Sequence, residues 1–115
     1  MEKVNYCECL DSLLPVRDAL DLISGKWKIQ VIISIGVGNH RFSEIQRSIP
    51  TITPKVLAKE LKDLEQHRLI KREILNSYPV TIQYTLEPYA DTLTPIIQSL
   101  KEWGKSHRKK LFALT

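Results

Sequence analysis

Residues 53–69 read TPKVLAKELKDLEQHRL and predict a short helix with two incompatible faces. Three leucines recur at helical spacing and share one stripe: Leu57, Leu61 and Leu64. Three lysines repeat at the same spacing and, at about 100° per residue, fall on nearly the opposite side: Lys55, Lys59 and Lys62. The leucine stripe needs a hydrophobic core behind the helix. The lysine stripe needs either water or an anionic partner in front of it.

A second short helix is predicted immediately before this one. The residues SEIQ form a capping box, in which Ser43 is the N-cap and Gln46 reaches back to it. Pro50 ends this helix, and Thr53 then caps the next one, with Pro54 in its first position. About four residues separate the two helices, which is the spacing of a helix-turn-helix.

Two further helices are predicted upstream. The first begins at Pro15, ends near Gly25 and carries an apolar stripe: Val16, Ala19, Leu20 and Ile23. Residues 26–35, with the sequence KWKIQVIISI, are apolar on nearly every side, so they predict a buried central helix.

Downstream the periodicity changes. Residues 69–75 and 81–87 predict two short strands joined by a hairpin tip, and three residues of the second strand are expected to point inward: Ile82, Tyr84 and Leu86. Helical spacing returns from about residue 89, and Pro95 is expected to kink the first turns of this last helix.

The resulting order, four helices, a hairpin and a helix, is that of a winged helix-turn-helix. The predicted fold class is therefore mainly α with a small β-hairpin wing (α+β), with helices for dimerisation at both ends. We expect a single domain over 1–115, a recognition helix at about 53–67, a wing at about 69–87 and a dimerisation helix at about 89–113.

Positive charge is concentrated around the helix-turn-helix. Between residues 39 and 72 lie eight of the 17 Lys and Arg but only four of the 13 Asp and Glu, and the rest of the chain holds nine of each. This segment therefore carries the whole formal net charge of +4. We expect the lysine stripe to face the phosphates and base edges of a DNA major groove. The alternative is a solvated surface helix.

The expected DNA contacts follow from position. Lys55 and Val56, in the first turn of the recognition helix, are expected to meet base edges, lysine to guanine and valine to a thymine methyl group. Thr51 and Thr53 lie at the helix entrance, where hydroxyls and backbone N–H groups can hold a phosphate. The remaining expected contacts are Arg41, Ser43, Lys59, Lys62 and, on the wing, Thr81.

The last helix carries more apolar surface than one helix at the end of a chain needs. Its apolar residues at helical spacing are Leu93, Ile96, Ile97, Leu100 and Trp103. They either complete the core of the domain or form a dimer interface. We expect the dimer, because a two-fold axis presents two recognition helices one DNA turn apart, about 34 Å.

Cys7 and Cys9 are the only cysteines, and a disulfide between them would be strained across one intervening residue. They are either incidental thiols of a cytoplasmic protein or sensors of an oxidant or another effector. Two thiols are too few for a metal site and the histidines show no ligand spacing, so no metal or cofactor is expected. No apolar run suits a membrane span, and no catalytic constellation predicts an enzyme.

Four stretches of the chain resemble the HxlR-type winged-helix transcriptional regulators, which are small bacterial and archaeal dimers. The resemblance implies a dimer formed largely by the terminal helices, a recognition helix in the major groove and a wing beside the minor groove. The matching stretches are PVRDALDLISGKW (15–27), RFSEIQRSIPTITPKVLAKELKDLEQHRLIKRE (41–73), YPVTIQYTL (78–86) and LTPIIQSLKEWG (93–104).

The chain departs from this family at three positions. Leu14 stands where the family often has a sensing cysteine before the proline of the first helix, so redox sensing does not transfer to that position. The family wing commonly reads Pro-Pro-Arg-Val-Glu-Tyr, and here Thr81 replaces the cation expected near a phosphate or a narrow minor groove. Ala90 replaces a frequent glycine before the last helix.

We therefore expect a sequence-specific transcriptional regulator. It would be a cytoplasmic homodimeric repressor that binds a pseudo-palindromic double-stranded DNA operator. A regulator that an oxidant or another effector switches through Cys7 and Cys9 is a further alternative. The alternative is a protein–protein interaction module on a winged-helix scaffold with weakened DNA binding. The missing wing cation and the modest net charge of +4 motivate this alternative.

Overall fold

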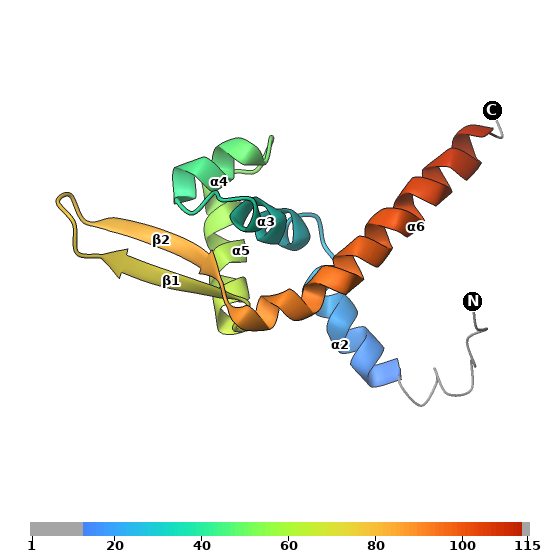
Figure 1. Cartoon of the computed structure of the whole chain (residues 1–115), viewed down its shortest axis with the longest axis horizontal. Helices are drawn as coiled ribbons and strands as arrows, with labels where there is room; N and C mark the ends of the chain where they lie inside the picture. Colours follow the sequence, from blue (N-terminus) through green and yellow to red (C-terminus); the bar gives the residue numbers. More distant parts are fainter. Residues whose placement is uncertain (1–12, 114–115) are drawn as a thin grey trace.

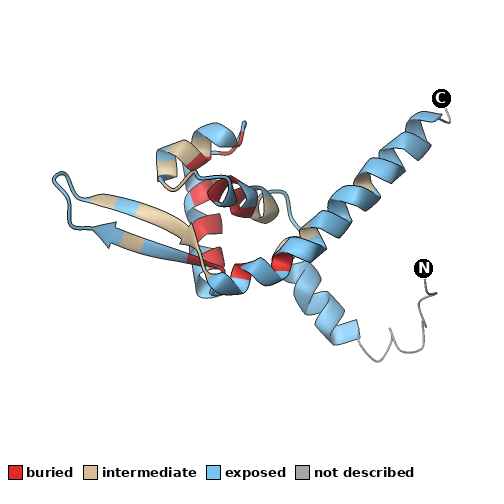
Figure 2. Ribbon diagram, in the orientation of Figure 1, coloured by how far each residue is buried: buried red, intermediate tan, exposed pale blue. Residues whose placement is uncertain are grey.

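Helix α3 (Lys28–Gly36) lies at the centre of the structure, a computed structural model that describes residues 13–113. Val31, Ile32 and Ile35 are buried on its inner side, whereas Ile33 is 46% exposed. The central helix is thus confirmed, but one side of it faces solvent. The buried residues gather around α3 and the two helices that follow it (Figure 2).

Helices α4 (Phe42–Ser48) and α5 (Pro54–Gln66) form the helix-turn-helix. The predicted start of α5 is confirmed, because Thr53 Oγ1 accepts a hydrogen bond from the Val56 backbone N–H at 3.2 Å. The predicted capping box of α4 is wrong. Its N-cap is Arg41, without a side-chain cap bond, and Ser43 is already inside the first turn. Phe42 packs against the core as the first helical residue, so packing sets this helix start.

The two strands β1 (Ile70–Leu75) and β2 (Thr81–Leu86) pair antiparallel, with Ile70 opposite Leu86 at the root of the hairpin and Leu75 opposite Thr81 near the tip. Tyr84 and Leu86 pack against the core as predicted. Ile82 lies on the same side of β2 as Tyr84 and Leu86, but it is 38% exposed, so the burial predicted for it is wrong because the core does not extend that far along the hairpin. The hairpin extends away from the helices (Figure 1), and the residues at its root, Ile70 and Leu86, belong to or pack against the core, whereas Ile74 and Ile82 are exposed.

The last segment is a 3₁₀-helix, η1 (Pro88–Leu93), followed by α6 (Thr94–Ala113). This corrects the single kinked helix predicted from residue 89. Pro95 is the second residue of α6, where its missing N–H group has no partner to lose. Leu93 is only 7% exposed and belongs to the core of the chain itself. The dimer surface proposed below therefore leaves it out.

Helix α2 (Leu13–Ile23) contains no buried residue and begins two residues before Pro15, which lies in its first turn. Both α2 and α6 leave the central helices on the side away from the hairpin (Figure 1). The order of helices and hairpin confirms the winged helix-turn-helix fold, with β1 and β2 as its wing.

Helix α5 ends in a tight cap that leads directly into the wing. The Arg68 N–H donates to the Glu65 carbonyl and the Leu69 N–H to the Leu64 carbonyl, both at 3.0 Å, which is a Schellman motif. Arg68 occupies the left-handed position of this motif, with φ of 61°, where glycine is the usual residue. Leu64 and Leu69 are buried beneath it.

One ion pair joins α3 to α5. Lys28 Nζ lies 2.8 Å from Glu60 Oε2 and 3.5 Å from Asp63 Oδ2, and Glu60 is buried. The hydrogen bond to Glu60 and the charges of both carboxylates raise the pKa of Lys28 above its ordinary 10.5, against the opposing effect of burial. Because the pKa of Lys28 is higher in the folded state, the pair stabilises the fold fully below pH 10.5.

Replacement of Lys28 by methionine is expected to lower the free energy of unfolding at pH 7 by about 1–3 kcal/mol, because Glu60 stays buried without its partner. Urea unfolding measures this loss. The difference from the wild type should shrink as the pH rises through the raised pKa of Lys28. Lys71→Met is the matched control, since Lys71 and Glu73 form an exposed pair at 3.2 Å whose loss should cost little. Equal losses in both variants would contradict this account.

Candidate nucleic-acid interface

Helix α5 presents the two faces that its sequence predicts. Its three leucines are at most 2% exposed and line the core. Its three lysines are all exposed: Lys55, Lys59 and Lys62. The burial along one side of α5 is visible in Figure 2. The helix is therefore held from behind, and its cationic side is open to a partner.

Two of the three acidic residues of α5 pair with a lysine of another helix and not with the lysines of α5. Glu60 and Asp63 turn toward Lys28 of α3 and pair with it. Within residues 13–113, Lys55, Lys59 and Lys62 form no ion pair. Lys28 thus pairs with two of the three acidic residues of α5, and the third, Glu65, is exposed and forms no ion pair within residues 13–113. Sequence reasoning missed this role of Lys28, because the pair joins residues 32 positions apart.

The turn before α5 carries two of the expected phosphate contacts. Thr51 is exposed and has φ of 74°, an uncommon backbone conformation for a β-branched residue. Thr53 is also exposed, and its hydroxyl oxygen accepts the cap bond from Val56. The Thr53 hydroxyl hydrogen stays available to a phosphate, so capping and DNA contact are compatible. Val56 packs partly against the core, which leaves only part of its side chain for a base edge.

Helix α4 places its two expected contacts at its beginning. Arg41, the N-cap residue, and Ser43, in the first turn, are both exposed. Arg47, which is also exposed, donates a hydrogen bond from its Nε to the Ser43 carbonyl at 3.4 Å.

The outer part of the wing lacks the cation that a phosphate-binding hairpin would use. Thr81 is half-buried, and its hydroxyl lies 3.3 Å from the Ser77 hydroxyl across the turn. No residue from 74 to 86 carries a formal charge. The cations of the wing are Lys71 and Arg72 at its root, and Lys71 is paired with Glu73. Arg72 is exposed and was not among the expected contacts.

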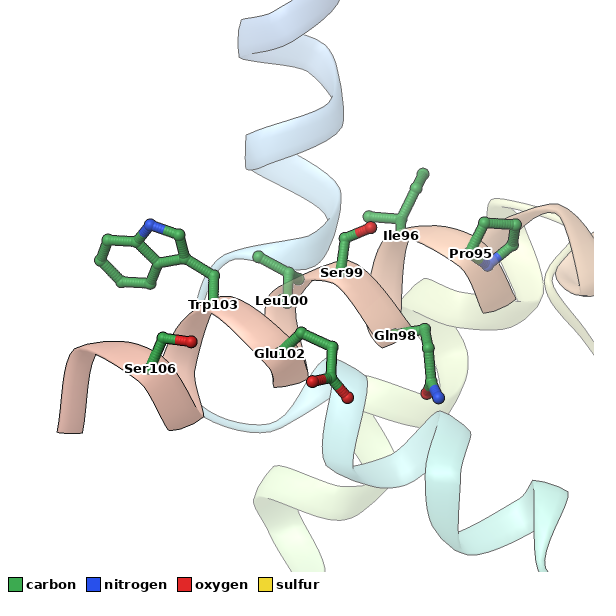
Figure 3. Close-up of a pocket in the computed structure, with 8 residues that line it drawn as sticks. All are labelled: Pro95, Ile96, Gln98, Ser99, Leu100, Glu102, Trp103 and Ser106. Atoms are coloured by element: carbon green, nitrogen blue, oxygen red, sulfur yellow. The ribbon is translucent and has the colours of Figure 1, made fainter. Parts of the chain in front are cut away.

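Helix α6 offers an apolar surface away from the wing. Ile96, Leu100 and Trp103 are 44%, 50% and 66% exposed and project from one side of the helix (Figure 3). Ile97 packs partly against the core. The Trp103 ring stacks on His107 at 4.8 Å between centroids, which extends the same side by a further turn.

Helix α2 adds apolar residues that are also exposed: Leu13, Leu14, Val16 and Leu20. The two sensing candidates, Cys7 and Cys9, lie outside the described residues. Within residues 13–113, no group of three or more His, Cys, Asp or Glu is placed to hold a metal ion. No helix in the described part of the chain is both long and apolar enough to cross a membrane.

Comparison with known proteins agrees with this geometry. Residues 22–111 match the model of the HxlR-like helix-turn-helix family. YybR of Bacillus subtilis strain 168, an uncharacterized HTH-type transcriptional regulator, is 38% identical over 97 residues, 84% of this chain and 78% of YybR. YtcD of the same organism, another such regulator, is 33% identical over 115 residues, 100% of this chain and 86% of YtcD.

Solved structures show the same fold. The redox regulator HypR in its reduced form superposes with a TM-score of 0.78 at 37% identity, over 86% of this chain and 98% of HypR. The oxidized form of HypR gives a TM-score of 0.73 at 38% identity, over 80% of this chain and 95% of HypR.

Proposed function

Because the chain belongs to the HxlR-like helix-turn-helix family of transcriptional regulators, we propose that it is a homodimeric repressor acting on DNA in the cytoplasm. Its operator is pseudo-palindromic and receives one copy of α5 in each of two major-groove half-sites. Bound dimers occlude the promoter. The observation that carries this proposal is the outer side of α5, which is cationic, exposed and free of ion pairs within the described residues.

The chemistry of this side suits a duplex. Lys59 and Lys62 lie in the middle and later turns of α5, where an ammonium group can reach a phosphate without specifying a base. Lys55 and Val56 lie in the first turn, which meets base edges in this class of motif. Thr51 and Thr53 at the start of α5, and Arg41 and Ser43 at the start of α4, supply hydroxyl, guanidinium and backbone donors to the flanking phosphates. These roles make α5 the recognition helix.

The exposed apolar residues of α2 and α6 support the dimer. They lie on the side of the molecule away from the wing, so a second copy can cover them without blocking α5 (Figure 1). Burial of Ile96, Leu100 and Trp103 by their counterparts removes apolar surface from water and stabilises the pair. The two-fold axis of such a dimer explains why the operator has two matching halves.

An oxidant response is a second proposal, and similarity to the redox regulator HypR supports it. In this chain Cys7 and Cys9 are the thiols that would carry it, because Leu14 occupies the position before Pro15. A thiolate at either residue can be oxidised to a disulfide with a second thiol, one in the partner subunit included.

Lys59→Ala and Lys62→Ala are each expected to weaken binding to all duplex sequences and to reduce the slope of log affinity against log salt by about one unit. Fluorescence anisotropy on an operator selected from random duplexes measures both effects. Lys109→Ala on α6 is the control with the same charge change. A salt slope unchanged in both α5 variants, or no sequence enriched at low salt, would favour the protein–protein interaction module instead.

Leu100→Asp is expected to convert the dimer into a monomer at micromolar concentration, because it places a charge at the centre of an apolar interface. Sedimentation velocity gives the mass directly. Val37→Asp is the matched control, since Val37 is 74% exposed at the end of α3, outside the proposed interface. A wild-type chain that sediments as a monomer, or a Leu100→Asp variant that stays dimeric, contradicts the proposed interface.

Serine at both Cys7 and Cys9 is expected to abolish any loss of operator binding caused by diamide, while leaving binding under reducing conditions unchanged. Gel shifts with and without oxidant compare the variant and the wild type. An oxidant response that survives both substitutions removes the thiols from the mechanism but leaves the DNA-binding proposal intact.

A further inference from the structure

The outer half of α6 carries more positive charge than the composition of the chain suggests. Outside residues 39–72 the chain holds nine Lys and Arg and nine Asp and Glu, but five of those nine cations lie between residues 101 and 110. Glu102 is the only acidic residue in this segment. Five cations against one anion give it a formal net charge of +4, as large as that of the whole chain.

Four of the five cations share one side of α6, because they recur at i, i+4, i+7 and i+8. We call this side the cationic stripe: Lys101, Lys105, Arg108 and Lys109. All four side chains are exposed, and within residues 13–113 none of them forms an ion pair. The charge of the stripe is therefore not neutralised within the described part of the chain.

The cationic stripe lies apart from the apolar side of α6 that the proposed dimer uses. At about 100° per residue, Lys105 lies about 140° around the helix from Leu100. The outer half of α6 also extends away from the other helices and the hairpin (Figure 1). A second copy seated on Ile96, Leu100 and Trp103 can therefore bind without covering the stripe.

A hollow of about 840 Å³ follows the stripe near the end of α6, and its lining includes Lys105, Arg108, Lys109 and Phe112. Phe112 is 64% exposed, and the Arg108 guanidinium lies over its ring, 5.5 Å from the ring centroid. Cationic groups and an aromatic ring thus line the same hollow.

The spacing of the stripe suits a second helix. Lys101, Lys105 and Arg108 follow one another after four and three residues, which is about 4.5–6 Å along the helix axis. Carboxylates at i and i+3 or i+4 on a neighbouring helix have the same spacing. The ring of Phe112 adds an apolar contact that a row of phosphates would leave unmatched. The partner that this surface favours is a helix with acidic residues along one side and an apolar side chain beside them.

We propose that the cationic stripe binds an acidic amphipathic helix of another protein. Carboxylates of that helix face the lysines and the guanidinium of the stripe, and one of its apolar side chains packs against Phe112. Opposite charges arranged in this way orient the encounter and determine which partners bind. The inference goes beyond the proposed function, because it concerns a different helix and does not require DNA binding.

A synthetic helical peptide provides the test, with the full-length protein. The probe is labelled with fluorescein and carries glutamate at every third or fourth position beside a row of leucines. A second peptide has glutamine in place of each glutamate. Fluorescence anisotropy is expected to show the glutamate peptide binding about tenfold more tightly than the glutamine peptide at low salt, and Lys105→Glu is expected to remove this difference.

Lys110→Glu is the matched control, because Lys110 is exposed on the same helix but lies about 140° around it from Lys105. It makes the same charge change and is expected to leave the affinity for the glutamate peptide within about twofold of the wild-type value. Unchanged far-UV circular dichroism of Lys105→Glu would show that α6 is intact.

Equal affinity of the wild type for the two peptides overturns the inference, as does a Lys105→Glu variant that binds the glutamate peptide like the wild type. Phosphatidylglycerol vesicles or random-sequence duplex DNA, bound more tightly than the peptide and lost in Lys105→Glu, would assign the stripe to lipid or nucleic acid instead. Wild-type species larger than a dimer that disappear in Lys105→Glu would assign it to another copy of the chain. Absence of operator binding overturns the proposed function and leaves this inference standing.

Discussion

The ion pair of Lys28 with the two carboxylates of α5 is the interaction on which the functional surface depends. It draws Glu60 and Asp63 toward the interior, so two of the three acidic residues of α5 stabilise the packing of α3 against α5. Within residues 13–113, Lys55, Lys59 and Lys62 form no ion pair on the outer side. Stability and positive surface charge thus arise from one placement of side chains around a single helix.

Signals within a few residues of each other predicted α5 well, although the equally local capping box at Ser43 and Gln46 was wrong. Thr53 and Pro54 mark the start of α5, and the leucine spacing identifies its buried side, because capping and amphipathicity are local properties. Features set by packing were not visible. The start of α4 depends on where Phe42 meets the core, and Leu93 is buried because η1 turns it inward.

In the candidate site, too, local sequence predicts some features, and contacts between distant residues decide the others. Exposure of the three lysines follows from their position opposite the leucines. The absence of ion pairs around them does not, because it depends on Lys28, which lies on a different helix. Likewise, the sequence shows that the wing lacks a cation. Only the register and the extent of the core reveal that its outer half is an uncovered apolar surface.

The cap at Arg68 has a mechanical consequence. The Leu69 N–H is bonded back to α5 while Ile70 already begins β1, so no flexible linker lies between the helix and the hairpin. The orientation of the hairpin relative to α5 is therefore fixed by these hydrogen bonds. In the proposed complex, a duplex that contacts both elements would itself supply any adjustment in groove width or curvature. The stiffness of base-pair steps that no side chain touches then becomes part of operator selection.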